Sequence, residues 1–410
     1  QTCALPIWRN LLGSPDPALR ELALSLFREL RDPGINAALI AEAAGLDPAW
    51  QAAAITALVD VREPRALPLI EAKAKEGPVA LRTVALRALG RVGGASSVPV
   101  LLRAVGETGA DAVVEAATEG LVRISSPAAG PALLAATKAA DVALKVRLIG
   151  VLGDRREESA VPALFEWAAG AEAEAGKAAL RALGIVLNPV ELPRLIALAA
   201  SAPDEDRRLL ADRAIVTTAM KIVEPARRPD ALLQAFREAA DPARRAALLR
   251  PLGVVVRTMG PTHPVFFAVR GALQDADPGV RAAAVRCLAE WPDATPAVTL
   301  LEFAARPDAR DAQREAAVRA VVRMAGRVAS GQENSPLDVV RTLSAAAGVA
   351  RTKAEKLQVV AGLGASRRLA ALPLLAPFLD DADAARLKAA RFKPAIALLM
   401  AGEWVGERLR

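Results

Sequence analysis

The 410-residue sequence has little of what most enzymes and secreted domains need. It contains two cysteines and one histidine, so it can form neither a disulfide framework nor a zinc site with several ligands. Aromatic residues make up only 3%, and tyrosine is absent. The longest run without a charge, residues 124–137, is interrupted by Pro127 and Pro131 and is too short to span a bilayer.

Motifs of the common catalytic classes are missing as well. Residues 170–178 approximate a phosphate-binding loop, but the spacing is wrong and Ala178 stands where a magnesium-binding hydroxyl is required. No nucleophile elbow and no haem attachment motif occurs. His263 has no recognisable nucleophile beside it, and Cys287 occupies a core position of its expected helix. We therefore expect a protein that is not an enzyme and that binds no cofactor and no metal.

Alanine is the most abundant residue, and hydrophobic residues make up 53% of the chain. Alanine has the highest helix propensity and loses no side-chain entropy, so this composition predicts closely packed helices. Charged residues account for 24%, and the formal net charge is +7. A basic balance of this size agrees with an acidic partner.

Prolines mark a repeat. Five of them, from Pro68 to Pro193, are spaced by 31, 32, 31 and 31 residues, and five more continue the register with looser spacing. Each precedes or begins an apolar run, and proline suits the first helical turn because its missing N–H has no partner there. We therefore expect a helix, called A, to start near each of Pro68, Pro99, Pro131, Pro162, Pro193, Pro229, Pro264, Pro296, Pro336 and Pro373.

A second helix, called B, is expected about fifteen residues after each proline. In residues 79–90 the apolar side chains fall at i, i+3, i+4, i+7 and i+8, which is the stripe of an amphipathic helix. The same offsets recur at Val280, Ala283, Ala284, Cys287 and Leu288. Because glycine commonly closes a helix in a left-handed conformation, we expect B helices to end at Gly90, Gly153, Gly184, Gly253 and Gly364.

A two-helix unit of roughly 34 residues cannot bury both of its apolar faces alone. Stacking about twelve such units produces one continuous core. The predicted fold class is therefore all-α, a right-handed α-solenoid or superhelix of about twelve two-helix repeats, with no strands.

The Asp-Pro-x-Val-Arg-x-x-Ala pattern of residues 277–284, together with the Leu-Pro-x-Leu start of helix A, resembles HEAT repeats. The similarity extends over Trp8 to Met400 and is strongest to the short bacterial type related to phycobilisome-lyase repeats. Residues 283–400 further resemble HEAT modules of large exported bacterial proteins. This resemblance implies a scaffold, and it implies that the chain is part of a longer, exported protein.

The first seven residues, 1–7, resemble the translation of a sequencing-library adapter. We therefore expect them to be a scar that plays no part in the fold. The expected domain organisation is a single HEAT-repeat array over residues 8–410.

Two columns of basic residues follow when the B helices are aligned. The first column lies at the edge of the apolar stripe and is expected to bridge adjacent repeats; it comprises Arg82, Lys145, Arg245, Arg281, Arg314 and Lys356. The second lies five residues further along, on the outer side, and could line a concave ligand surface or simply be solvated; it comprises Arg87, Arg181, Arg250, Arg286 and Arg319.

The predicted function is a non-catalytic scaffold for protein interaction or domain spacing, monomeric and without a membrane span. Its expected partner is another protein or a neighbouring domain of the same longer chain. Two alternatives remain open. One is a nucleic-acid or other polyanion-binding HEAT-like protein, and the other is an accessory module of a lyase or of an exported sugar-oxidising enzyme.

Overall fold

The computed structural model describes residues 4–256, 264–366 and 368–374, and every regular element in them is a helix. The A helices carry odd numbers: α1 (Ala4–Leu12), α3 (Pro33–Ala43), α5 (Leu67–Lys75), α7 (Ser97–Val105), α9 (Ala129–Ala139), α11 (Val161–Ala169), α13 (Leu192–Ala200), α15 (Asp230–Glu238), α17 (Pro264–Ala272), α19 (Ala297–Ala305) and α21 (Val339–Val349). The B helices carry even numbers: α2 (Pro17–Leu30), α4 (Pro48–Asp60), α6 (Val79–Val92), α8 (Asp111–Arg123), α10 (Val142–Asp154), α12 (Ala173–Val186), α14 (Glu205–Met220), α16 (Pro242–Val256), α18 (Pro278–Ala289), α20 (Asp311–Ala329) and α22 (Lys353–Ala365).

Short 3₁₀ helices supplement these elements. Most of them lead into the next A helix; they are η1 (Pro64–Ala66), η2 (Glu158–Ala160), η3 (Pro189–Glu191), η4 (Pro225–Arg227) and η5 (Leu369–Leu374). None of the α-helices in the described residues combines the length and the apolar character that a membrane span requires.

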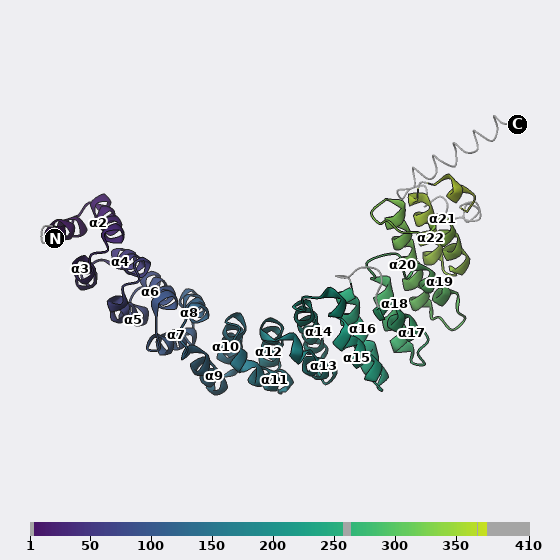
Figure 1. Ribbon diagram of the computed structural model, residues 1–410, viewed down its shortest axis with the longest axis horizontal. Coiled ribbons are helices and arrows are strands. Elements are labelled where there is room, and N and C mark those ends of the chain that lie inside the picture. The colour runs from purple at the N-terminus through teal and green to yellow at the C-terminus, as the bar shows by residue number, and fades with distance from the viewer. Residues whose placement is uncertain (1–3, 257–263, 367, 375–410) are drawn as a thin grey trace, which may run out of the picture. The chain divides into compact units, whose positions relative to one another are not determined.

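The helices form two compact units (Figure 1). Unit 1 holds the described residues of Gln1–Leu187 and Ser201–Ala214, and unit 2 holds those of Asn188–Ala200 and Ile215–Arg410. Within each unit, A helices pack on B helices, and B helices pack on the B helix of the next repeat, as α6 does on α8 and α16 on α18. The protein is an all-α solenoid.

The proline register predicts the A helices well. Nine of the ten prolines lie within three residues of the start of an A helix; Pro68 is the second residue of α5, for example, and Pro296 directly precedes α19. Pro373 is the exception, because it lies inside η5. After these nine prolines, the B helices begin 11 to 17 residues later, as α6 and α22 illustrate.

The apolar stripes form the core. In α18, every member of the predicted stripe is at least 94% buried, and in α6 only Val84 is partly exposed. Aspartate caps hold the first turn of several B helices. Asp277, for example, accepts hydrogen bonds from the backbone N–H groups of Gly279 at 2.8 Å and Val280 at 3.0 Å.

The prediction that glycines close the B helices in a left-handed conformation is wrong. Gly90, Gly153 and Gly253 lie inside α6, α10 and α16, and none of them has a positive φ. Each lies instead where two B helices approach closely. A Cβ atom on Gly90 would come within 2.7 Å of the Gly120 Cα in α8, and a Cβ on Gly253 would meet the Cys287 sulfur of α18 at 3.0 Å.

Arginines take the left-handed conformation just after three B helices, and Gly331 takes it after α20. Arg31, Arg62 and Arg156 have φ values of 48°, 55° and 54°.

Arg62 is followed directly by Glu63, whose carboxylate joins two repeats. It accepts hydrogen bonds from the Arg65 side chain at 2.8 and 3.0 Å and from the Asn36 amide, in α3, at 2.7 Å.

These contacts lower the pKa of Glu63 to about 2, chiefly because the Arg65 guanidinium hydrogen-bonds the ionised carboxylate. A carboxyl group whose pKa is depressed in the folded state stabilises the fold above its unfolded pKa, and that contribution is lost as the pH falls. The stabilisation by Glu63 should therefore be complete near neutral pH and disappear towards pH 2.

Replacing Glu63 tests this pH dependence. Glu63→Gln should lower the free energy of unfolding by about 1.5–3 kcal/mol at pH 7, because two charge-assisted contacts are weakened. The difference from the parent should shrink when denaturation is measured at successively lower pH between 5 and 2. Glu76→Gln, at an exposed position in the same unit, serves as the control and should show no such trend.

Two glycine substitutions test the close helix contacts. Gly90→Ala should cost about 1–3 kcal/mol, because the new methyl group collides with the backbone of α8. Gly150→Ala, in α10, adds a methyl group with nothing within 4 Å and should stabilise the helix by about 0.5–1 kcal/mol. Thermal unfolding followed by circular dichroism should therefore move the two melting temperatures in opposite directions. Two shifts of the same sign would contradict the assigned contact.

Candidate partner-binding surface

Two positions recur along the B helices, the fourth and the ninth residue. The expected bridging residues Arg82, Lys145, Arg245, Arg281, Arg314 and Lys356 are the fourth residues of α6, α10, α16, α18, α20 and α22. The expected binding residues Arg87, Arg181, Arg250, Arg286 and Arg319 are the ninth residues of α6, α12, α16, α18 and α20. Because five residues correspond to about 140° around an α-helix, the two positions point in different directions.

Four of the fourth-position side chains reach an acidic residue of the next repeat. Arg82 donates to both carboxylate oxygens of Glu107, at 3.0 and 2.5 Å, and Lys145 donates to Glu172 at 2.8 Å. Glu107 lies in the turn between α7 and α8, and Glu172 lies in the turn between α11 and α12. Such contacts tie the first turn of one B helix to the connection in its neighbour.

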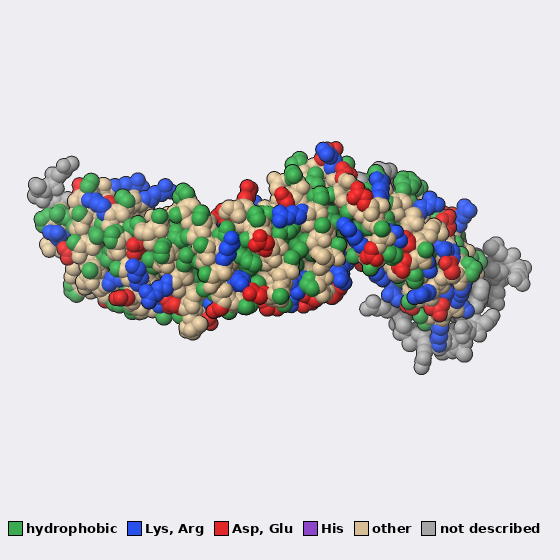
Figure 2. All heavy atoms as spheres, turned by 90° about the horizontal axis from the view of Figure 1, so that it is seen from below, with side chains coloured by type: hydrophobic (Ala, Val, Ile, Leu, Met, Phe, Trp, Pro, Cys, Tyr) green, Lys and Arg blue, Asp and Glu red, His purple; other side chains and the backbone are tan. Residues whose placement is uncertain are grey.

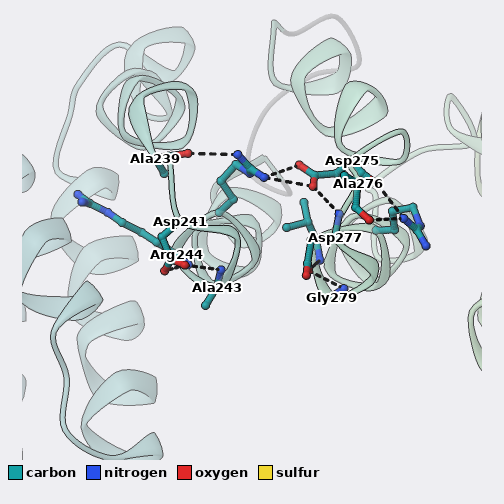
Figure 3. A network of polar contacts seen from close by, with 11 residues as sticks. Ala239, Asp241, Ala243, Arg244, Asp275, Ala276, Asp277 and Gly279 are labelled. Atoms are coloured by element: carbon teal, nitrogen blue, oxygen red, sulfur yellow. Dashed lines mark hydrogen bonds and ion pairs between the residues drawn. The ribbon is translucent and has the colours of Figure 1, made fainter.

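Asp275 shows how one turn collects several of these contacts (Figure 3). Its carboxylate lies 3.1 Å from the Arg245 guanidinium and accepts a hydrogen bond from the Asp277 N–H at 2.9 Å. Arg281 donates to the backbone oxygens of Asp275 and Ala276 at 2.8 and 2.9 Å, within its own turn. The turn before α18 is thereby held by cations from two B helices.

The contact between Arg314 and Glu355 is buried completely. The Arg314 side chain is 1% exposed and the Glu355 side chain 0%, and their Nε and Oε1 atoms are 3.0 Å apart. Arg314 also donates to Asp311, while Glu355 accepts from the N–H groups of Arg351 and Thr352 in a capping box at the start of α22. These additional hydrogen bonds offset part of the cost of burying two charges.

The remaining fourth-position residues differ. Lys356 is exposed on α22. Arg20, the fourth residue of α2, was not part of the expected column, yet it contacts Asp47, the cap of α4, at 3.2 Å and stacks on the Trp50 ring.

The ninth-position arginines are all exposed, but their surroundings differ between the units. In unit 1, Arg87 pairs with Glu119 of α8 at 2.9 Å, and Glu119 is itself a ninth residue. The ninth residue of α10 is Gly150, so α8 and α10 separate Arg87 from Arg181. The ninth-position residue Arg213, which the sequence analysis missed, lies on α14.

In unit 2, the ninth-position arginines occur on consecutive helices. Arg250, Arg286 and Arg319 lie on α16, α18 and α20, and α18 packs against both of the other helices. Arg319 pairs with Glu315 of its own helix at 2.5 Å. The three guanidinium groups thus lie at equivalent places on adjoining repeats.

The B helices of unit 2 present a predominantly basic surface. On α16, α18, α20 and α22, all of whose residues are described, seven exposed basic residues stand against one exposed acid, Asp311. The basic residues are Arg244, Arg250, Arg286, Arg319, Arg323, Lys353 and Lys356.

Among the described residues of the other helices, basic and acidic side chains are more evenly balanced. On the A helices of unit 2, four exposed arginines stand against three exposed acids. Figure 2 shows acidic, basic and hydrophobic side chains interspersed on the face that it presents. On the B helices of unit 1, six exposed basic residues stand against nine exposed acids. Arg87 and Arg181 therefore lie on an acid-rich face, and the other three predicted binding residues on a basic one.

The residues considered for chemistry have no catalytic surroundings in the described part of the chain. Cys287 is 6% exposed and packs against Gly253 in the contact between α16 and α18. His263 lies outside the described residues. Within those residues, no group of three or more potential ligands is arranged to hold a metal ion.

The buried pair provides a test of the inter-repeat contacts. Arg314→Met should lower the free energy of unfolding by about 3–5 kcal/mol, because Glu355 would be left as a buried charge without a cation. Arg319→Met, on the same helix but exposed, should cost less than about 1 kcal/mol. Chemical denaturation of both variants measures the difference. Equal effects would show that Arg314 does not act as a bridge.

Comparison with known proteins agrees with this architecture. A family model described as HEAT repeats matches residues 130–216, while no curated protein sequence matches. Two similar solved structures are a mutant of Kap121p, with a TM-score of 0.51, and Kap121p bound to Nup53p, with a TM-score of 0.50. Both are 13% identical and are matched over 96% of this chain, which spans only 49% and 48% of those chains.

At this level of identity, the solved structures establish similarity of fold. The family match begins in α9, covers α10, α11, α12 and α13 completely and ends in α14, and the same alternation of A and B helices continues on either side of it. Together these findings identify the chain as a HEAT-repeat protein.

Proposed function

We propose that this protein is a non-catalytic scaffold whose unit 2 binds an acidic partner protein through α16, α18, α20 and α22. The observation that carries the proposal is the excess of seven exposed basic residues over one exposed acid on these helices. A surface of one sign attracts a partner of the opposite sign and accelerates their encounter. The partner is an acidic segment of another protein or of a longer chain that contains this array.

The repeat architecture supports this assignment. A solenoid offers an extended surface on which contacts add up from repeat to repeat. The similar fold of Kap121p has been solved with Nup53p bound, so a solenoid of this kind can hold a protein partner. Arg87 and Arg181 are left out of the proposed surface, because the B helices of unit 1 expose more acids than bases.

Binding of poly-glutamate to the full chain tests the proposal. The parent should bind the polymer, and affinity should fall as salt is raised, because exposed charges are screened. A triple variant with Arg250→Gln, Arg286→Gln and Arg319→Gln should lose about tenfold or more in affinity, since three charge-assisted contacts disappear. Its melting temperature should barely change, because exposed charges contribute little to stability.

The matched control removes the same charge from unit 1, at the same helical position, with Arg87→Gln, Arg181→Gln and Arg213→Gln. It should bind poly-glutamate as the parent does. Equal losses in the two triple variants would contradict a surface confined to unit 2. Binding of duplex DNA with a log–log salt slope near about −2.7, as three phosphate contacts require, and no binding of poly-glutamate would replace the protein partner with a nucleic acid.

A further inference from the structure

The spacing of Arg250, Arg286 and Arg319 points to a specific conformation of the partner. We infer that unit 2 binds an acidic segment in the polyproline II conformation, with a carboxylate at every third residue. This inference rests on the proposed function, and it adds the conformation and the residue spacing of the bound segment.

The distance between neighbouring B helices sets the spacing of the three arginines. The three arginines occupy the same position on α16, α18 and α20, which pack directly on one another. Packed helices have axes about 8–10 Å apart. Equivalent side chains on adjoining repeats are therefore offset by about the same distance, and a partner that contacts all three must present acids at this interval.

A segment in the polyproline II conformation presents side chains on one side at this interval. It has three residues per turn and a rise of about 3.1 Å per residue, so residues i, i+3 and i+6 lie on one side at intervals of about 9 Å. In a β-strand, residues on one side repeat every second position, at about 6.6 Å. A strand would place its carboxylates out of register with successive arginines, whereas polyproline II places one beside each.

Small side chains lie beside the arginines and leave room for a bound chain. The residues three and four positions before Arg250 and Arg286 are all alanines, and those before Arg319 are Ala316 and Glu315. Ala246, Ala247 and Ala282 among them are partly exposed, so the short side chains on the N-terminal side of Arg250 and Arg286 leave space for an extended backbone. Polyproline II also has no internal hydrogen bonds and is already ordered before binding, so little entropy is lost on association.

Glu315 is an acid within the track. It pairs with Arg319 at 2.5 Å, so a partner carboxylate must compete with it for that guanidinium. Removing the Glu315 charge should therefore strengthen binding of an acidic segment. A general attraction between a basic face and any polyanion would not depend on this one contact to the same degree.

Two synthetic peptides of identical composition test the inference on the full chain. One contains four consecutive Glu-Pro-Pro triplets, and the other has its four glutamates adjacent, with four prolines on either side. The triplet peptide should bind about tenfold more tightly or better in fluorescence anisotropy, because it can pair with three arginines at once. Arg286→Gln should remove most of that advantage, and Glu315→Gln should increase the affinity several-fold.

Arg87→Gln is the matched control for Arg286→Gln and should leave the peptide affinities unchanged, while melting curves verify that all variants are folded. Equal affinity for the two peptides would overturn the spacing inference. If their binding is then still weakened by the triple variant of unit 2, the proposed acidic partner stands without the spacing. Failure of the parent to bind either peptide or poly-glutamate would overturn the proposed function itself.

Discussion

The close approach of successive B helices is the constraint on which the other features depend. Glycine or alanine occupies the contact at Gly90 against Gly120, and at Gly153 against Ala182. Because no bulky side chain separates these helices, their fourth residues come within reach of the next connection, where Glu107 and Glu172 receive them. The ninth residues point elsewhere and remain exposed. Packing in the core thus determines which cations hold the array together and which are available to a partner.

The two units differ in the charge that their B helices expose, and the composition of the whole chain does not reveal this difference. The net charge of +7 belongs to the whole chain, but the B helices of unit 1 expose more acids than bases and those of unit 2 far more bases than acids. Arg87 illustrates the difference, because Glu119 of the neighbouring repeat neutralises it. In unit 2, Arg286 occupies the same helical position, and the residues at that position on the adjoining helices are Arg250 and Arg319. A solenoid can therefore confine recognition to part of its length while every repeat keeps the same fold.

Much of the fold could be predicted from the sequence, because proline at the first helical turn and the apolar stripe are local signals. The role of the glycines could not, since a left-handed cap and a close helix contact both require a residue without a Cβ atom. Arg20 and Arg213 were missed, although they occupy the fourth position of α2 and the ninth position of α14. The acidic partners of the fourth-position cations lie 25 to 41 residues away, so only the stacking of repeats reveals them.

The buried pair of Arg314 and Glu355 makes one junction unlike the others. Elsewhere a cation and its acid remain partly solvated, as Lys145 and Glu172 do, so a repeat could be exchanged for another with little electrostatic penalty. Between α20 and α22, a foreign neighbour would leave the buried Arg314 or Glu355 without its inter-repeat partner. This junction therefore restricts where the array can gain or lose a repeat by duplication or deletion. The length of the solenoid is free to vary during evolution at most of its junctions, but the order of α20 and α22 is not.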